Sequence, residues 1–258
     1  MSVRVTNIQR MCCDDGPGIR TTVFLKGCSI HCPWCSNPEN ISYEKQPICD
    51  RENPQTYTGR EYGMDYEPQK LVSVLEKDRK FWGCDGGVTF SGGEALLQAV
   101  QLEEVWVQLK RDGIHLALET ALFIPEPLLE IAMQYIDFYY VDVKLLDEDL
   151  CASVLGGNIG QYRQNVERLV SQQKNIHFRV PCSKEYVLQE SNQAALCDFF
   201  RQYRQYPVEI FSIHDLGREK YRTLGMEMPR FENVTDVELE AFQRRLSKEG
   251  CQVKIISI

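Results

Sequence analysis

Short apolar runs alternate with amphipathic stretches along most of the chain. Runs rich in β-branched and aromatic residues predict strands, and stretches with helical periodicity predict helices. The predicted strands are residues 19–25, 88–90, 115–119, 137–144, 175–180 and 208–213, with a further one at 252–256. The predicted helices are residues 66–82, 95–111, 127–135, 147–155, 161–172, 191–203 and 236–249.

This alternation predicts a parallel sheet, because parallel strands need long crossover connections, which helices usually supply. Six βα units fall short of the eight that close a barrel, so a partial barrel and a doubly wound sheet both fit the pattern. Residues 41–65 are rich in Asn, Pro, Tyr, Gly and charged residues, which predicts an insertion loop. We expect residues 1–258 to form a single domain.

The charge and hydropathy of the chain limit its partners and its location. A net charge of −8 argues against nucleic-acid or anionic-membrane binding driven by charge alone. No apolar run approaches the roughly 18 residues of a spanning helix, and the first residues lack the apolar core of a secretory signal. We therefore expect a cytoplasmic protein, in which eleven cysteines are not a disulfide framework. They are metal ligands, reactive thiols or small core residues.

Three of these cysteines, Cys28, Cys32 and Cys35, follow the first predicted strand with the spacing C-x3-C-x2-C. Structural zinc uses four ligands, usually as two separated pairs, and no second Cys-x2-Cys pair is present. His31 is a conceivable fourth ligand, but its direct neighbour Cys32 makes joint coordination awkward. Three thiolates also suit a [4Fe–4S] cluster with one iron left open. The spacing favours this cluster over zinc.

Polar residues stand at the ends of several other predicted strands, where functional groups of parallel βα folds collect. Two glycines in the turn Ser91-Gly92-Gly93-Glu94 allow a ligand to approach the backbone, although an ordinary turn would also use them. Asp142 and Lys144 share one face of their strand, as functional groups or as a self-contained ion pair.

The remaining strand-end residues are Glu119 with Thr120, Arg179, and His214. Thr120 is either part of a site or a helix N-cap. Arg179 suits a carboxylate or a docked peptide backbone, or else a surface ion pair. His214 is either a ligand contact or a structural histidine.

Several stretches resemble the radical S-adenosylmethionine enzymes, and most closely the activating enzymes of glycyl radical enzymes. Besides the cysteine triplet and the Gly-Gly-Glu turn, they are Asp15-Gly16-Pro17-Gly18-Ile19-Arg20, Cys35-Ser36-Asn37-Pro38-Glu39 and the run from His214 to Tyr221. The similarity covers nearly the whole chain. It implies an α/β fold, a partial (β/α)6 TIM-like barrel open on one side.

The resemblance also implies a role for each site position. Three irons of one [4Fe–4S] cluster would be bound by Cys28, Cys32 and Cys35. S-adenosyl-L-methionine would be held at its amino group by Gly92, Gly93 and Glu94, at its carboxylate by Lys144, and at its ribose by His214. Asp142 would lie near the ribose or a monovalent cation, whose site Glu119 and Thr120 would help to form, and Arg179 would complete the cofactor-binding set.

By the same resemblance, a reduced cluster cleaves S-adenosylmethionine, and a Cα hydrogen is removed from a glycine of a partner glycyl radical enzyme. The resemblance implies flavodoxin or ferredoxin as electron donor, and we expect a monomer. Many such activases carry a ferredoxin-like insert with about eight cysteines. Between Ser36 and Ser91 this chain has only Cys49 and Cys84, so we expect no ferredoxin-like cluster domain.

The chain departs from the family at two places, which keeps other functions open. Ala121-Leu122 stands where the family often has Ser-Gly, and Cys12-Cys13 precedes the Asp-Gly-Pro-Gly turn. The alternatives are a radical enzyme that modifies another peptide or a small molecule, and a non-catalytic iron–sulfur or zinc-binding protein. We expect Cys151, Cys182, Cys197 and Cys251 to be core thiols, and Cys84 to pack near the Gly86-Gly87 strand entry.

Overall fold

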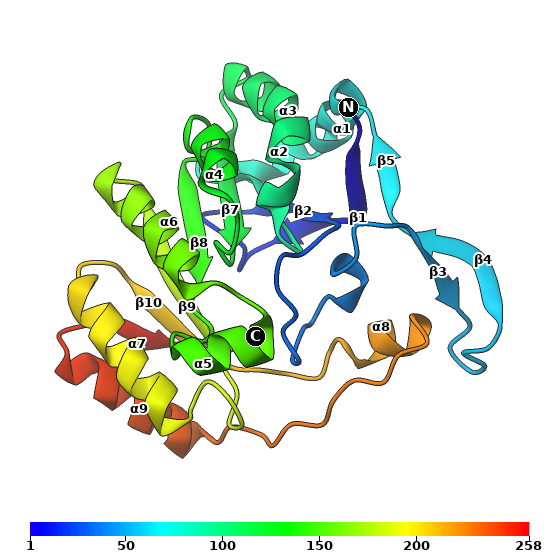
Figure 1. Ribbon diagram of the computed structural model, residues 1–258. Coiled ribbons are helices and arrows are strands. Elements are labelled where there is room, and N and C mark those ends of the chain that lie inside the picture. The colour runs from blue at the N-terminus through cyan, green and yellow to red at the C-terminus, as the bar shows by residue number, and fades with distance from the viewer. Residues whose placement is uncertain (258) are drawn as a thin grey trace.

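The chain folds around one large curved sheet, in a computed structural model that describes residues 1–257. Within these residues the sheet has nine strands in the order β11-β10-β9-β8-β7-β6-β2-β1-β5, and β3 and β4 form a separate hairpin (Figure 1). The strands are β1 (Val3–Cys12), β2 (Arg20–Leu25), β3 (Gln46–Cys49), β4 (Tyr57–Tyr62), β5 (Met64–Tyr66), β6 (Gly87–Gly92), β7 (His115–Thr120), β8 (Phe138–Asp142), β9 (Ile176–Cys182), β10 (Val208–Ser212) and β11 (Val253–Ile255).

Helices connect the parallel strands, and no helix among residues 1–257 is both long and apolar enough to cross a bilayer. The longer ones are α1 (Pro68–Leu75), α3 (Ala99–Arg111), α4 (Glu126–Met133), α6 (Ile159–Ser171), α7 (Glu190–Gln202) and α9 (Asp236–Lys248). The short ones are η1 (Pro38–Asn40), η2 (Glu76–Asp78), α2 (Arg79–Trp82), η3 (Ala95–Gln98), α5 (Glu148–Leu150), η4 (Cys151–Leu155) and α8 (Arg218–Thr223).

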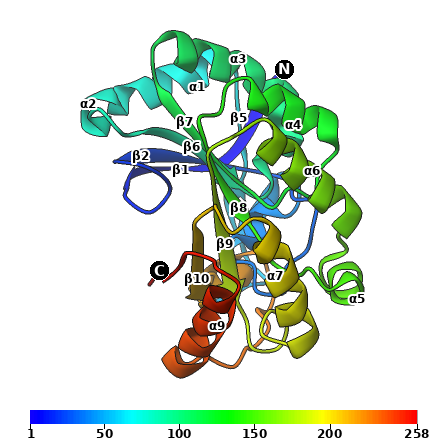
Figure 2. The ribbon, with the colours of Figure 1, turned by 90° about the vertical axis from the view of Figure 1, so that its left-hand side faces the viewer.

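The sheet is a partial barrel. Each neighbouring pair from β2 through β6, β7, β8, β9 and β10 to β11 is parallel, whereas β1 runs antiparallel to β2 and to β5. Helices α3, α4, α6 and α7 all lie along the same face of the curved sheet, where a doubly wound fold would use both faces (Figure 2). Strands β5 and β11 end the sheet without pairing with each other. The prediction of an open (β/α)-type barrel is therefore confirmed.

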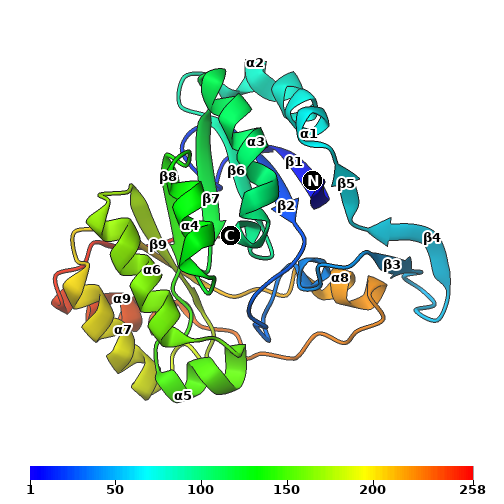
Figure 3. The ribbon, with the colours of Figure 1, turned by 45° about the horizontal axis from the view of Figure 1, so that its top comes forward.

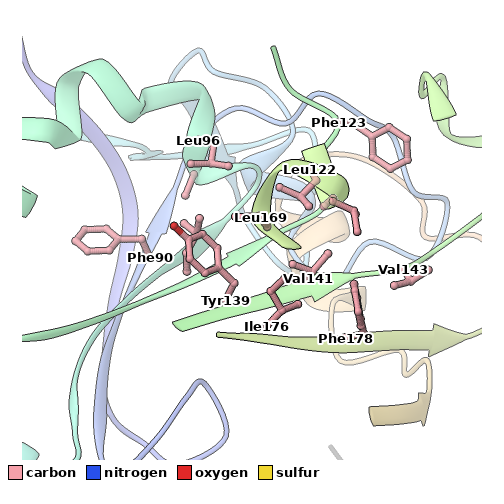
Figure 4. Close-up of a cluster of buried hydrophobic side chains, with 14 of the residues drawn as sticks. Phe90, Leu96, Leu122, Phe123, Tyr139, Val141, Val143, Leu169, Ile176 and Phe178 are labelled. Atoms are coloured by element: carbon pink, nitrogen blue, oxygen red, sulfur yellow. The ribbon is translucent and has the colours of Figure 1, made fainter. Parts of the chain in front are cut away.

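Side chains alternate along β8 and through Val143, the residue that follows it. One set lies in the main core, and the other set lies in the barrel interior. Tyr139, Val141 and Val143 belong to the large apolar cluster beneath the helices (Figure 4). Phe138 and Tyr140 belong instead to a small inner cluster on the opposite face. Because side chains alternate along a strand, this register sends Asp142 into the interior, as the sequence pattern predicted.

Three parts of the chain differ most from the sequence prediction. Residues 41–65 contain the hairpin β3–β4 and strand β5, not a continuous loop. Strand β1 was not predicted, because only Val3, Val5 and Cys12 of its ten residues are buried and no regular apolar alternation marks it. Helix α8 was not predicted either, since its six residues are too few to show helical periodicity.

The hairpin projects from the body of the molecule, next to α8 (Figures 1 and 3). Five of the six β4 residues are exposed, so a core behind the hairpin contributes little to its stability. It is attached to α8 instead, through the side-chain hydroxyls of Tyr62 and Thr223, which lie 2.9 Å apart.

Arg20, at the start of β2, is a fully buried cation inside the barrel. Its guanidinium donates to the Thr89 hydroxyl at 2.9 Å, to the Val88 carbonyl at 2.6 Å and to the Pro17 carbonyl at 3.3 Å. Burial lowers the pKa of Arg20 to about 10, so the side chain is still charged at neutral pH. These bonds join the turn at residues 15–18 to the interior of the sheet.

Replacing Arg20→Met should lower the free energy of unfolding by about 3 kcal/mol, because three buried acceptors lose a charged donor. Arg244→Met is a matched control: Arg244 is exposed and pairs only with Glu240 on α9, so the effect should stay within about 0.5 kcal/mol. Urea denaturation of both variants under reducing, anaerobic conditions measures the difference. Equal effects would show that the Arg20 bonds do not stabilise the fold.

Candidate active site

One cavity of about 310 Å³ lies where β2, β6, β7, β8, β9 and β10 end. Eleven of the twelve residues predicted for the site line it: Cys28, Cys32, Cys35, Gly92, Gly93, Glu119, Thr120, Asp142, Lys144, Arg179 and His214. The exception is Glu94. Residues from six strand ends thus meet in one place, as the parallel topology requires.

The cysteine loop follows β2 and is held by backbone hydrogen bonds at several points. The amides of Gly27 and Cys28 donate to the carbonyls of Asn40 and Ile41, at 2.8 and 3.0 Å. On the other side, the amide of His31 donates to the Leu155 carbonyl at the end of η4, at 3.0 Å. The loop is therefore tied both to the chain that follows it and to the segment after β8.

Burial dominates the electrostatics of the three thiols. It raises the pKa of Cys28 to about 11 and of Cys32 to about 12, and it also raises that of Cys35. The ammonium of Lys144 opposes this shift at all three sites. A buried thiol gives up its proton readily only when a metal centre compensates the charge, so the loop suits metal ligation better than free nucleophilic chemistry.

The arrangement of the thiols bears on which metal centre fits. Among residues 1–257 no three His, Cys, Asp or Glu side chains are grouped so that they could hold a single metal ion. Structural zinc uses four ligands, whereas three thiolates on one loop suit a four-iron cluster, in which each thiolate binds its own iron. The Ser29 hydroxyl, buried within the same loop, has no hydrogen-bond partner in the part of the chain that the structure describes and is available to donate to a sulfur. The residues present therefore fit a three-cysteine cluster.

The turn at Gly92 and Gly93 needs glycine because it lies against the cysteine loop. A Cβ on Gly93 would approach the Gly27 carbonyl oxygen to 2.2 Å, and one on Gly92 would approach the Leu25 amide to 2.2 Å. Gly92 also has a φ of +116°, which side chains rarely adopt. We predicted that the two glycines let a ligand approach this turn. The structure shows that they let the backbone of the segment around Leu25 and Gly27 approach it.

Glu94 lies behind the cavity wall, with no exposed surface. Its carboxylate accepts hydrogen bonds from the Thr120 hydroxyl at 2.9 Å, from the Ala121 amide at 2.9 Å and from the Leu96 amide at 3.2 Å. Burial raises the pKa of Glu94 to about 7, although these three donors oppose the shift. Glu94 thereby joins the end of β7 to the turn after β6.

Asp142 and Lys144 both face the cavity and form an ion pair, with the Lys144 ammonium 2.7 Å from a carboxylate oxygen of Asp142. Burial favours the neutral amine, but Asp142 and the Cys32 thiol outweigh it and raise the pKa of Lys144. The ammonium is thus charged and lies between a carboxylate and the cysteine loop, within reach of an anionic ligand in the cavity.

Arg179 connects three groups around the cavity floor. Its guanidinium donates to Glu119 at 3.0 Å, to Glu209 at 2.9 Å and to the Asp14 carbonyl, and it lies 3.3 Å over the Tyr140 ring. Burial, with Asp15 nearby, raises the pKa of Glu119 to about 7, and Arg179 opposes that shift. Arg179 therefore holds the turn of residues 14–18 against the end of β7, and it is not a surface ion pair.

His214 follows β10 at the cavity edge. Its Nδ1 accepts from the Leu216 amide at 3.3 Å, which leaves Nε2 as the protonated nitrogen. Burial lowers the pKa of His214, so the ring is neutral at pH 7. A neutral imidazole with a free N–H donor suits a hydroxyl oxygen of a ligand.

The cavity also has an apolar wall that our sequence analysis did not identify. It is formed by Phe24, Ile30, Trp34, Ile41 and Phe211. Trp34 packs against Tyr186 with ring centroids 5.5 Å apart and is 4% exposed. The sequence could have predicted this role for Trp34, which lies between Cys32 and Cys35. A large aromatic residue inside the cysteine loop must pack beside the site.

The other eight cysteines form no second site in residues 1–257, where every cysteine is free. Cys151, Cys182, Cys197 and Cys251 are buried, as predicted for core thiols. Cys84 is exposed, so our expectation that it packs near Gly86 was wrong: it lies in the turn between α2 and β6, outside the core.

Leu122, one of the two family departures, has an unusual backbone. Its φ is +58°, although the side chain is fully buried. Its amide donates to the Thr120 hydroxyl at 3.0 Å, and its carbonyl accepts from the Asn165 side-chain amide at 2.9 Å. The left-handed turn that glycine would adopt freely is held here by two hydrogen bonds and by core packing (Figure 4).

Comparison with known proteins gives the same assignment for most of the chain. Residues 22–186 match the Radical SAM superfamily. The chain is 30% identical to pyruvate formate-lyase 2-activating enzyme of Escherichia coli K12, over 98% of this chain and 92% of that protein. It is 28% identical to choline trimethylamine-lyase activating enzyme of Oleidesulfovibrio alaskensis, over 98% of this chain and 97% of that protein.

The fold is also similar to that of solved radical SAM structures. QueE from Escherichia coli covers 100% of this chain and 95% of its own length, with a TM-score of 0.56 at 14% identity. At that identity the likeness concerns the fold alone. The sequence matches, together with the cysteine loop and the cavity, show that this chain belongs to the radical SAM superfamily, in the family of glycyl radical enzyme activating enzymes.

Proposed function

We propose that this protein cleaves S-adenosylmethionine reductively and removes a Cα hydrogen from a glycine of a partner glycyl radical enzyme. The observation that carries the proposal is the single cavity shared by the three cysteines, the glycine turn, the Asp142–Lys144 pair and His214. The activating enzymes that it resembles at 28–30% identity support the reaction class.

When bound, a reduced [4Fe–4S] cluster supplies the electron that cleaves the sulfonium of S-adenosylmethionine, which yields methionine and finally 5′-deoxyadenosine. Cys28, Cys32 and Cys35 hold this cluster at the cavity. Lys144 binds the methionyl carboxylate, and backbone groups of Gly92 and Gly93 bind the amino group. His214 donates from Nε2 to the ribose, and Trp34 excludes water from one wall.

Glu94 has a different role in this proposal from the one that the family resemblance implied. Its carboxylate already accepts three donors from Thr120, Ala121 and Leu96. We infer that Glu94 positions the turn and the end of β7 and does not itself contact the amino group. Glycine is the substrate residue because only glycine has no side chain to obstruct the approach to Cα, and the open side of the barrel leaves room for its loop.

We extend the proposal to the physiological setting. Flavodoxin or ferredoxin is the electron donor, and the protein is a cytoplasmic monomer with one radical SAM domain over residues 1–258. All eleven cysteines are free in the described chain, which agrees with a reducing compartment. The hairpin at residues 46–62 takes the place of a ferredoxin-like insert, because Cys49 and Cys84 are too few to ligate a cluster.

Anaerobic reconstitution with iron and sulfide, followed by dithionite and S-adenosylmethionine, should yield 5′-deoxyadenosine, measured by liquid chromatography. Cys32→Ala should abolish the product, because the cluster loses one of three ligands, whereas Cys84→Ala should retain full yield. If Cys32→Ala still forms product, the ligand assignment is wrong. Absence of product from the wild type, with a partner enzyme present, would contradict the whole proposal.

We also propose that a monovalent cation binds beside Asp142, Glu119 and Thr120. Replacing K⁺ by N-methyl-D-glucamine at constant ionic strength should raise the KM for S-adenosylmethionine by about tenfold, the effect of losing roughly 1.4 kcal/mol of binding. In Asp142→Asn this dependence should disappear, because a neutral amide attracts the cation weakly. A KM equal in both salts for the wild type would show that no cation acts here.

A further inference from the structure

The segment from His214 to Thr223 crosses the back of the cysteine loop, between the cavity and the hairpin. It begins with His214 at the cavity and ends with Thr223, whose hydroxyl meets that of Tyr62. Helix α8 of this segment lies beside η1, which directly follows the cysteine loop (Figure 3). Residues 161 and 183 positions apart in the sequence are therefore joined behind the site.

One ion pair joins α8 to η1, and we call this contact region the junction. The Lys220 ammonium lies 2.9 Å from one carboxylate oxygen of Glu39 and also donates to the side-chain oxygen of Asn37. The Glu39 side chain is only 6% exposed, and its second oxygen is buried without a hydrogen-bond partner among residues 1–257. A nearly buried carboxylate with one direct cationic partner depends strongly on that partner.

A second, uncharged contact fixes the spacing of the same two segments. A Cβ on Gly217 would lie 3.0 Å from the Ser36 carbonyl oxygen and 3.2 Å from that of Cys35. Between Gly217 and the cavity, the Leu216 amide donates to Nδ1 of His214. A shift of α8 relative to η1 would thus be passed both to Cys35 and to the imidazole.

We propose that Lys220 is a positioning residue, whose ion pair with Glu39 fixes the cysteine loop and His214 relative to each other. The inference rests on the proposed function, because it assigns the two ends of the junction to the cluster and to the S-adenosylmethionine ribose. Lys220 touches neither of them. Its loss allows α8 and η1 to separate, so that the loop and the imidazole no longer face the cavity together.

The first test measures hydrogen exchange in the full chain without cluster, which does not depend on any activity. Lys220→Met should speed amide exchange by about tenfold or more in residues 35–41 and 214–217 at once. Arg222→Met removes the same charge from the same helix, where Arg222 pairs with exposed Glu219, and should leave both segments unchanged. Lys220→Arg should restore most of the protection.

The second test uses the reconstituted enzyme and S-adenosylmethionine cleavage. Lys220→Met should raise the KM for S-adenosylmethionine by about tenfold, with a smaller fall in kcat, because a misplaced His214 weakens binding. The double variant Glu39→Gln with Lys220→Met removes the unpaired buried charge and should recover the melting temperature. If the ion pair only stabilises the fold, the double variant should also show the wild-type KM and the wild-type exchange rates. If the ion pair positions the loop and His214, the double variant should keep the raised KM and the faster exchange.

Two results would overturn the inference. One is unchanged exchange at residues 214–217 in Lys220→Met, and the other is a normal KM in the double variant. If the wild type gives no 5′-deoxyadenosine, the proposed function fails, while the exchange experiment still decides whether Lys220 couples the two segments.

Discussion

Backbone contact between the start of the cysteine loop and the turn after β6 sets the geometry of this site. The carbonyl of Gly27, directly before the first ligand cysteine, accepts from the Glu94 amide at 2.7 Å, while the Gly93 amide donates to the Leu25 carbonyl at 2.9 Å. No side chain fits between these strands, because a Cβ on Gly93 would overlap the Gly27 oxygen. The cysteine loop and the Gly92-Gly93 turn are therefore held together directly, and the other strand ends are arranged around them.

The interior of the barrel is charged, and its charges are connected in pairs and networks. Lys144 is compensated by Asp142, Arg179 by Glu119 and Glu209, and Glu94 by donors from the end of β7 and from η3. Buried charges that lose a partner are strongly destabilising, so each of these groups also fixes the position of its neighbours. The site is preorganised by the same bonds that allow polar groups to be buried.

The sequence predicted the site better than it predicted the segments that support the site. Cys28, Asp142 and His214 were predicted to lie together, and they line one cavity, because strand ends of a parallel sheet converge and position along the chain translates into position in space. The sequence did not show that Glu94 lies behind the turn, where its carboxylate accepts from Thr120 and Ala121, since only the folded chain brings these residues together. Lys220 and Glu39 lie in two stretches that carry the family resemblance, but their pairing could not be predicted, because an ion pair between residues so distant in sequence has no periodicity or spacing.

The outer elements escaped prediction for a related reason. Strand β1 and the hairpin β3–β4 bury few side chains, and hydrophobic periodicity reports only what is buried. The π-type turn η4, whose Leu155 carbonyl binds the cysteine loop, was expected as part of an ordinary helix. Such departures from regular helix occur often where a backbone group is needed outside the helix.

Leu122 shows how a family position can change without a change in chemistry. A left-handed conformation costs a residue with a side chain about 1–2 kcal/mol, while burying a leucine side chain contributes roughly 1.5–3 kcal/mol. The two effects nearly cancel, so a chain that exchanges glycine for leucine here keeps its stability and its Thr120–Glu94 bond. The end of β7 therefore keeps its left-handed turn without glycine, at little net cost in stability.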